Sequence, residues 1–316
     1  MAVIRGRFAP SPTGEMHLGN AWTALLAWLH TRQQGGTMIL RMEDLDPDRS
    51  RPEHARQLME DLVWLGLDWD EGPDSGGPYG PYSQSERRNL YEEAVHVLNK
   101  AGLVYPCYCT RAELQAVALA PHHDGREGVY PGTCRPGAGT RRGSEGSRSP
   151  ALRLMVPAET IYYDDGLAGR QCQQLDRDCG DFVVRRSDGV HAYQLAVVVD
   201  DGRMAVTHVL RGNDLLSSTP RQLLLYRLLK LTPPSFVHVP LLYGADGHRL
   251  SKRHGSLSLG ALRRRGVQAD AIVGYLAWKA GQQSAPEPVT PADLVSTFSL
   301  HFVPREPIVV DGDFSW

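Results

Sequence analysis

Two short segments, far apart in the sequence, hold residue types that could bind a polyphosphate. The first, Arg7–Asn20, reads RFAPSPTGEMHLGN, and the second, Arg249–Arg253, reads RLSKR. In the first, His17 can donate to a phosphate oxygen, and Gly19 leaves room for a nucleotide ring to lie close. In the second, Lys252 would contact phosphates as a point charge. Each segment alone is typical of an ordinary turn. The sequence has no GxxxxGK[ST] loop, so a nucleotide site must be built differently.

The cysteines form a second group of reactive side chains. Their number, 5, is odd, which favours metal binding or free thiols over a disulfide framework. Cys107 and Cys109 are separated by one residue, and with Cys134 they offer three thiolates to one tetrahedral ion. Three unrelated buried thiols are the competing interpretation. The candidates for a fourth ligand are His122, His123 and Tyr130, and ligand chemistry alone favours a histidine. The remaining cysteines, Cys172 and Cys179, lack a matching partner pattern.

Composition excludes several classes of protein. The 316 residues are 41% hydrophobic and 22% charged, with a net charge of −2, so the chain is not a generally basic nucleic-acid binder. Local basic clusters remain at Arg141–Arg142, Arg185–Arg186 and Arg263–Arg265, although a solvated face is the simpler interpretation of each. No apolar run is long enough to span a bilayer, and the N-terminus lacks the apolar stretch of a signal peptide. We therefore expect a cytoplasmic protein with no membrane association.

The first hundred residues alternate between strand and helix patterns. Strands are expected at Val3–Ala9 and Met38–Met42, the second of which delivers Glu43 at its end. Helices are expected from Leu18 to Gln34 and after Ser50 and Ser85. This alternation indicates an α/β fold with a doubly wound parallel sheet. In such sheets ligands bind beyond the carboxyl ends of the strands, where the His17 segment and Glu43 would lie.

The second part of the chain interrupts and then resumes this pattern. The pattern changes between Val104 and Val190, and it includes a Gly/Ser/Arg-rich stretch at 137–149. A strand is expected at Tyr193–Val199, ending in two aspartates, and another at Val206–Leu210. A helix should start at Thr219, with Gln222 completing a capping box. We thus expect a sheet in two halves, 1–103 and 191–235, an insertion at 104–190, and a loop with short helices at 236–316.

The two phosphate-binding segments, taken together and in this order, resemble the signature sequences of class I aminoacyl-tRNA synthetases. Further segments narrow the resemblance to the glutamyl branch of that family and extend it over nearly the whole chain. Those segments are Arg41–Asp46, Asp181–Arg186, Ala192–Asp201 and Val209–Leu215. The resemblance implies a Rossmann-like catalytic domain and activation of glutamate with ATP and Mg²⁺.

The resemblance also implies roles for individual residues. Glutamate has two carboxylates and an ammonium, and an arginine can bind a carboxylate in bidentate fashion where a lysine cannot. The implied glutamate-binding residues are Arg7, Ser11, Glu43, Tyr193 and Arg211. The implied ATP-binding residues are His17, Gly19, Asn20, Ser251 and Lys252, with His17 and Lys252 stabilising the phosphoryl transition state. The implied structural zinc site is Cys107, Cys109, Tyr130 and Cys134, which places tyrosine rather than histidine as the fourth ligand.

The chain departs from the long members of the family in three ways. Asn20 stands where they usually have histidine, and Arg249 stands where the loop usually begins with lysine. The sequence also ends at Trp316 without the helical anticodon-binding domain of the long enzymes. In this it resembles the short paralogues, which would activate glutamate without tRNA and transfer it to queuosine in tRNA(Asp), and we expect a monomer. A truncated enzyme that charges tRNA(Glu) and a non-catalytic tRNA-binding module are the alternatives.

Overall fold

A six-stranded sheet forms the centre of the computed structural model, which describes residues 3–110, 112–114, 129–137, 149–250 and 257–310. The strand order is β2-β1-β8-β9-β5-β6, in which all neighbours are parallel except the hairpin β5–β6. The strands of this sheet are β1 (Arg5–Phe8), β2 (Thr37–Leu40), β5 (Thr160–Asp165), β6 (Gly169–Gln174), β8 (His208–Gly212) and β9 (Ser235–Val239). The α/β expectation is thus confirmed, with a mixed rather than purely parallel sheet.

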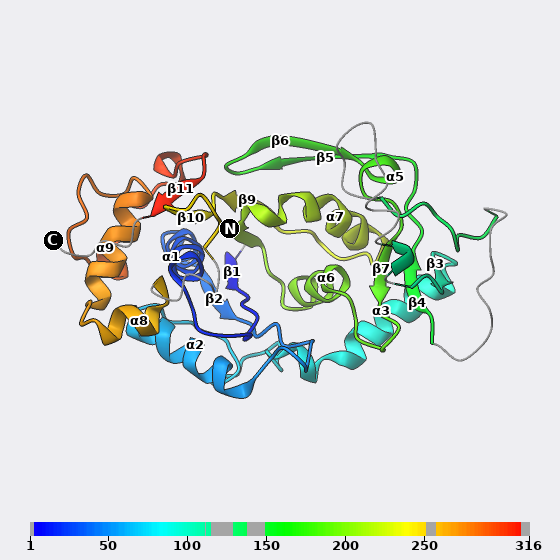
Figure 1. Ribbon diagram of the computed structural model, residues 1–316, viewed down its shortest axis with the longest axis horizontal. Helices are drawn as coiled ribbons and strands as arrows, with labels where there is room; N and C mark the ends of the chain where they lie inside the picture. Colours follow the sequence, from blue (N-terminus) through cyan, green and yellow to red (C-terminus); the bar gives the residue numbers. More distant parts are fainter. Residues whose placement is uncertain (1–2, 111, 115–128, 138–148, 251–256, 311–316) are drawn as a thin grey trace.

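Helices cover both faces of this sheet, as Figure 1 shows. Successive residues of a strand point to opposite faces. In β2, Met38 and Leu40 accordingly pack in one hydrophobic core, and Ile39 packs in the other. The helices of the first core are α1 (Leu18–Arg32), α2 (Pro52–Trp64), α8 (Leu259–Arg264), α9 (Ala269–Lys279) and α10 (Pro291–Leu294). Those of the second are α3 (Arg88–Lys100), α6 (Tyr193–Arg203) and α7 (Thr219–Leu228).

The expectation of a strand at Tyr193–Val199 was wrong, because this segment begins helix α6. The run of apolar residues from Leu195 to Val199 is buried throughout. Periodicity cannot distinguish a fully buried helix from a fully buried strand, since neither leaves a polar face. The consequence for the site is direct: Asp200 and Asp201 lie in the last turns of a helix and not at a strand end.

The segment expected as an insertion, 104–190, divides between two sheets. Its hairpin β5–β6 extends the central sheet beside β9. Its other strands, β3 (Val104–Cys107), β4 (Ala151–Leu154) and β7 (Phe182–Arg185), form a separate antiparallel sheet. The short helix α5 (Leu175–Asp178) joins the two. The sheet of β3, β4 and β7 and the C-terminal helices α8 and α9 lie at opposite ends of the long axis of the molecule in Figure 1.

The remaining elements are short. Strands β10 (Leu242–Gly244) and β11 (Ile308–Val310) pair in parallel, and 3₁₀ turns occupy Gln84–Glu86, Asn213–Ser218 and Leu300–Phe302. Within the described ranges, every helix is too short or too polar to cross a membrane.

Candidate active site

A pocket of about 430 Å³ lies at the carboxyl ends of β1, β2, β8 and β9. This is the edge at which a doubly wound sheet binds its ligands. The pocket brings together every predicted glutamate- and nucleotide-binding residue that the structure describes. Those residues are Arg7, Ser11, His17, Gly19, Asn20, Glu43, Tyr193 and Arg211. The other two, Ser251 and Lys252, lie outside the described residues.

Arg211 is buried in this pocket at the end of β8, with its hydrogen bonds going to uncharged acceptors. Its Nε donates to His238 Nε2 over 2.9 Å, and its Nη2 donates to Thr219 Oγ1 and Gln222 Oε1 over 2.9 and 2.8 Å. Its Nη1 is buried and has no hydrogen-bond partner. Burial lowers the pKa of Arg211 from its ordinary value. A buried cation with an unused donor beside a cavity is suited to binding an anionic ligand.

The expected capping box at the start of α7 was wrong. The helix N-cap is Ser218, which makes no side-chain capping bond. Thr219 and Gln222 instead accept hydrogen bonds from Arg211. Thr219 and Gln222 thus pair with the buried guanidinium and do not cap the helix. Leaving the donors of a buried cation unpaired would cost more free energy than losing a helix cap.

Arg7 and Glu43 bring opposite charges to the pocket from neighbouring strands. The Nε of Arg7 lies 3.5 Å from Asp201 Oδ1 and has no hydrogen-bond partner. The carboxylate of Glu43 accepts from Arg41 Nη2 over 3.2 Å. Burial raises the pKa of Glu43, and the guanidinium groups of Arg41 and Arg7 offset only part of the rise. Tyr193 lines the same pocket from the first turn of α6.

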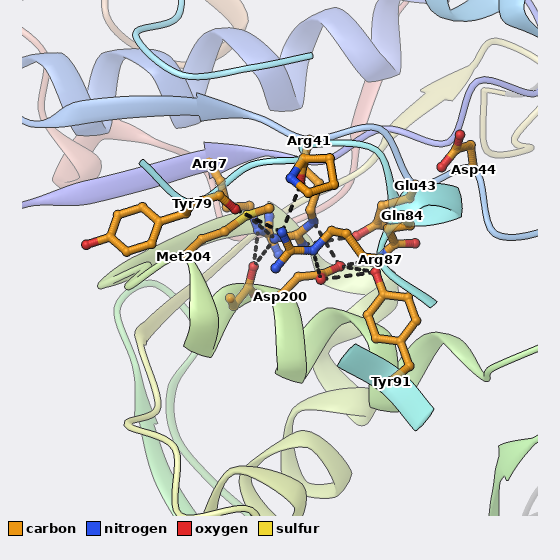
Figure 2. A network of polar contacts seen from close by, with 12 residues as sticks. Arg7, Arg41, Glu43, Asp44, Tyr79, Gln84, Arg87, Tyr91, Asp200 and Met204 are labelled. Atoms are coloured by element: carbon orange, nitrogen blue, oxygen red, sulfur yellow. Dashed lines mark hydrogen bonds and ion pairs between the residues drawn. The ribbon is translucent and has the colours of Figure 1, made fainter. Parts of the chain in front are cut away.

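A network of buried charges, shown in Figure 2, includes the pocket residues Arg7 and Glu43. Arg41 Nη1 lies 2.6 Å from Asp201 Oδ1, and its Nε lies 3.6 Å from Asp200 Oδ2. Although burial lowers it, the three surrounding carboxylates raise the pKa of Arg41 well above its ordinary value. The adjacent Asp200 also accepts hydrogen bonds from Arg87, Gln84 and Tyr91. Helix α6 therefore carries both a pocket residue and the acidic anchors of this network.

His17 and Asn20 form the start of helix α1. His17 Nδ1 accepts from the backbone N–H of Gly19 over 3.1 Å, and Asn20 Oδ1 accepts from the backbone N–H of His17 over 3.2 Å. This reciprocal pair is a capping box. Because Nδ1 is an acceptor, Nε2 carries the proton of the neutral ring. A Cβ on Gly19 would lie 3.0 Å from the His17 ring, so glycine permits this close arrangement.

Both flanks of the predicted lysine segment lie at the pocket. On one side, Leu250 lines the pocket, and Arg249 Nη1 lies 2.7 Å from Asp214 Oδ2. On the other side, Ser258 forms an antiparallel bridge with His17. The segment 251–256 between them lies outside the described residues. The two ends of the segment, Leu250 and Ser258, thus lie close to His17 and the pocket.

The three cysteines predicted as metal ligands converge. The Sγ atoms of Cys107, Cys109 and Cys134 all lie within 4.8 Å of one another. The Tyr130 hydroxyl lies 3.4 Å from Cys107 Sγ and 3.7 Å from Cys109 Sγ, and its oxygen accepts from the Cys134 backbone N–H. Arg153 Nε donates to Cys107 Sγ over 3.3 Å. The cluster could hold a metal ion. His122 and His123, the other candidate ligands, lie outside the described residues.

A wider groove of about 750 Å³ lies elsewhere, on α3 and α6. Its lining is mostly apolar, and its acidic residues Glu92 and Glu93 are already paired with Arg185 and Arg203. The smaller pocket has the convergent charges, and we therefore take it as the candidate active site.

Sequence reasoning missed the residues that orient the pocket. Arg41 lies within a segment that carries the family resemblance, but the sequence does not indicate that it is the centre of a charge network. Asp200 and Asp201 follow an apolar run, which is a signal of buried carboxylates that need partners. Nothing in the sequence connects His238 with Arg211, because their pairing depends on the register of β8 against β9.

Comparison with known proteins gives consistent matches over nearly the whole chain. A family model described as tRNA synthetases class I (E and Q), catalytic domain, matches residues 3–307. A protein from Symbiobacterium thermophilum, named glutamyl-Q tRNA(Asp) synthetase, is 55% identical over 315 residues, which cover 98% of this chain and 97% of that protein. A protein of the same name from Nitratidesulfovibrio vulgaris is 56% identical over 314 residues, with the same coverage of both.

A solved structure extends the likeness to three dimensions. It is a crystal structure of a glutamate tRNA ligase from Elizabethkingia meningosepticum in complex with its amino acid. The TM-score is 0.82 at 29% identity, and the match covers 97% of this chain and 66% of that one. This chain therefore spans about two thirds of the length of that ligase.

Proposed function

The chain belongs to the class I tRNA synthetases for glutamate and glutamine and is a ligase of that family, and we propose that it activates L-glutamate with ATP and transfers it to queuosine in tRNA(Asp). The match to proteins named glutamyl-Q tRNA(Asp) synthetase, over 97% of their length, supports this acceptor. The observation that carries the proposal for glutamate is a pair of buried arginines in one pocket, each with a nitrogen that makes no hydrogen bond.

Glutamate would be held by complementary charges. Arg7 and Arg211 would bind its two carboxylates, because Arg7 Nε and Arg211 Nη1 have no hydrogen-bond partner of their own. Glu43 would bind the ammonium group, with Tyr193 and Ser11 completing the contacts as hydroxyl groups. A pocket with two cations and one anion matches an amino acid with an anionic side chain better than a neutral one.

The activation step needs a second set of residues. A carboxylate oxygen of glutamate attacks the α-phosphorus of ATP, the bond to the β-phosphate breaks, and pyrophosphate leaves. His17, at the start of α1, would donate from Nε2 to the phosphates, where the helix N-terminus also favours an anion. Gly19 and Asn20 line the same region, and Ser251 and Lys252 would contact the phosphates from the lysine segment. Mg²⁺ bound with ATP supplies charge neutralisation at the phosphate oxygens.

The role of Lys252 is open to a direct test. Lys252→Ala should strongly reduce glutamate-dependent pyrophosphate exchange and leave glutamate binding largely intact, because the lysine would act on the transition state. Lys230→Ala is a suitable control, because Lys230 follows α7 and does not line the pocket. Unchanged exchange in Lys252→Ala would remove this residue from the mechanism.

Transfer would follow on the same enzyme. A hydroxyl of the cyclopentenediol of queuosine attacks the activated carbonyl, an ester forms, AMP leaves, and the hydroxyl proton is released. The test is to load tRNA with labelled glutamate and cleave it into anticodon and acceptor fragments. Label in the anticodon fragment of tRNA(Asp) is the expected result. Label at the 3′ end of tRNA(Glu) would identify a charging enzyme, and no label on any tRNA would indicate a binding role.

The cysteine cluster fits a structural zinc site. In a tetrahedral site with Zn–S bonds of about 2.3 Å, the sulfurs lie about 3.8 Å apart. The Sγ atoms of Cys109 and Cys134 are 3.6 Å apart. Burial raises the pKa of Cys109 to about 12, a rise that zinc would reverse because metal binding deprotonates thiols. Arg153 lies 3.8 Å from the centre of the Tyr130 ring and would balance part of the charge of the ligands.

Metal removal separates a structural from a catalytic role. A chelator selective for transition metals should loosen the sheet β3-β4-β7 and leave exchange without tRNA largely unchanged, because the cluster shares no residue with the pocket. Loss of exchange with the fold intact would place the metal in the chemistry instead.

We also propose the cytoplasm as the compartment, because tRNA and ATP are available there.

A further inference from the structure

Three residues from three different strands form a chain of hydrogen bonds that ends at the pocket. Asp165 ends β5, His238 lies in β9, and Arg211 lies in β8. The Asp165 Oδ2 to His238 Nδ1 distance is 2.6 Å, and the Arg211 Nε to His238 Nε2 distance is 2.9 Å. The side chains of Asp165 and His238 are fully buried. Neither residue lines the pocket, so both would act on a ligand indirectly, and Arg211 is their direct link to the pocket. His238 Nε2 also lies 3.2 Å from Thr219 Oγ1, itself a partner of Arg211.

The geometry determines which ring nitrogen of His238 carries the proton. A carboxylate only accepts hydrogen bonds, so Asp165 requires a proton on Nδ1. Arg211 Nε only donates, so it requires a lone pair on Nε2. Both demands are met by the neutral ring in a single tautomer. A proton on Nε2 would face the Arg211 N–H, and two donors would then oppose each other.

The charge state of the ring agrees with this geometry. Burial lowers the pKa of His238, and the hydrogen bond to Asp165 offsets only part of that effect, while Arg211 and Arg7 lower it further. Although burial raises the pKa of Asp165, the hydrogen bonds from His238 and from backbone N–H groups lower it overall. An ionised Asp165 beside a neutral His238 is therefore the stable combination.

Arg211 is therefore held in one orientation, but no carboxylate contacts it to balance its positive charge. Its Nε and Nη2 are held by neutral acceptors on His238, Thr219 and Gln222. Gln222 is fixed in turn by Gln194, to which its amide donates over 2.8 Å. Only Nη1 makes no hydrogen bond. The guanidinium plane is thereby set, and one donor with its positive charge remains for a ligand.

We propose that the pair Asp165–His238 is a positioning device for Arg211, which sets the affinity of the pocket for the carboxylate of its amino-acid substrate. This inference rests on the proposed activation of glutamate. Asp165 and His238 are positioning residues and do not touch the substrate. Removing the acceptor on His238, or inverting its tautomer, lets the guanidinium rotate and weakens binding of glutamate, while ATP binding, which uses other residues, is retained.

Asp165 also has a structural task, which determines the choice of variants. Its Oδ1 accepts from the backbone N–H groups of Leu167 and Ala168 over 3.0 and 2.8 Å, and from that of His238 over 3.2 Å. An alanine would lose the turn as well as the pairing. Asp165→Asn keeps an oxygen for these N–H groups and turns an amide donor toward His238 Nδ1, which favours the wrong tautomer.

The experiment measures glutamate-dependent pyrophosphate exchange in four variants of the full chain. His238→Met and His238→Gln form a matched pair, since the two side chains have similar size, and glutamine offers Arg211 Nε a strong acceptor whereas the methionine sulfur is a weak one. Asp165→Asn inverts the tautomer, and Asp164→Asn, an exposed neighbour on β5, is its control. Thermal unfolding of each variant checks that the fold is retained.

We expect the substitutions to change KM for glutamate much more than KM for ATP. His238→Met and Asp165→Asn should raise KM for glutamate about tenfold or more, as expected for a lost hydrogen bond to a charged group. KM for ATP should change less than about twofold in both. His238→Gln should restore KM for glutamate to within about threefold of the original, and Asp164→Asn should leave it unchanged.

Other outcomes would overturn either the positioning role of Asp165 and His238 or the proposed function. If the original protein shows exchange and His238→Met and Asp165→Asn keep its KM for glutamate, the positioning role is wrong. Equal changes in KM for glutamate and ATP, or no difference between His238→Gln and His238→Met, would mean a structural role only and would also overturn the inference. If the original protein shows no glutamate-dependent exchange, the proposed function itself fails.

Discussion

Arg41, in the network beside the pocket, and Arg211, in the pocket, are both buried but have opposite surroundings. Arg41 is surrounded by the carboxylates of Asp201, Asp200 and Glu43, all within 3.6 Å. Arg211 bonds only to neutral side chains and a backbone carbonyl and keeps one nitrogen without a bond. The protein thus neutralises a buried cation where it serves structure. It leaves the cation uncompensated where a ligand is proposed to supply the negative charge.

Helix α6 joins these two regions. Tyr193 and Asp201 are eight residues apart, which is about two helical turns, so they lie on the same side of the helix. Tyr193 lines the pocket, and Asp201 pairs with Arg41 and approaches Arg7. A disturbance of the network should therefore reach the pocket, whereas a change at Arg211, which has no hydrogen bond to the network, should leave the network intact.

The largest effect is expected from removing the cation of the network. Arg41→Met leaves Asp200, Asp201 and Glu43 buried without their shared partner, and a broken buried ion pair costs about 3–5 kcal/mol. Urea unfolding should show that loss in the free energy of unfolding. A loss below about 1 kcal/mol would mean that the other partners of the two aspartates are sufficient.

The same substitution in the pocket should have a different result. Arg211→Met removes a buried charge that has no carboxylate in direct contact, so the free energy of unfolding should change by about 1 kcal/mol or less. Binding of glutamate should weaken by about 1.5–3 kcal/mol, and KM for glutamate should rise accordingly. A large loss of stability with a normal KM for glutamate would mean that Arg211 has a structural role, as Arg41 has, and does not bind the ligand.

Binding of glutamate should depend on pH because of Glu43, the acid in the pocket. The pKa of Glu43 is raised, so on acidification it takes up a proton at a higher pH than an exposed glutamate does. The uncharged acid cannot pair with an ammonium group, and KM for glutamate should therefore rise as the pH falls, by up to about tenfold for each unit below that pKa. Glu43→Gln should have a high KM that changes little with pH. An identical pH profile in the variant would assign the titration to another group.

The smallest effect is expected at the edge of the network. Tyr91→Phe removes one hydroxyl from Asp200, which keeps Arg87 and Gln84 as partners. The cost should be about 1 kcal/mol in the free energy of unfolding, with KM for glutamate unchanged. Tyr162→Phe is the control, because Tyr162 is 62% exposed and the loss of its hydroxyl should cost little. Equal losses in both variants would show that the measurement does not report on the network.

The sequence predicted the place of the pocket better than its construction. Arg7, Glu43 and Arg211 follow or end strands, and the ends of parallel strands meet at one edge, so their convergence could be expected. The buried run before Asp200 has no period, which hid helix α6. The link from Asp165 through His238 depends on three strands from distant parts of the chain, and local patterns carry no information on such a register.

The most direct test of the account is pyrophosphate exchange into ATP with L-glutamate and no tRNA. We expect exchange that depends on glutamate, because the cations and the acid of the pocket are assembled without any nucleic acid. Exchange only after addition of tRNA(Glu) would contradict a pocket that is competent by itself and would indicate a tRNA-charging enzyme. No exchange under either condition would contradict the assignment of this pocket to glutamate activation.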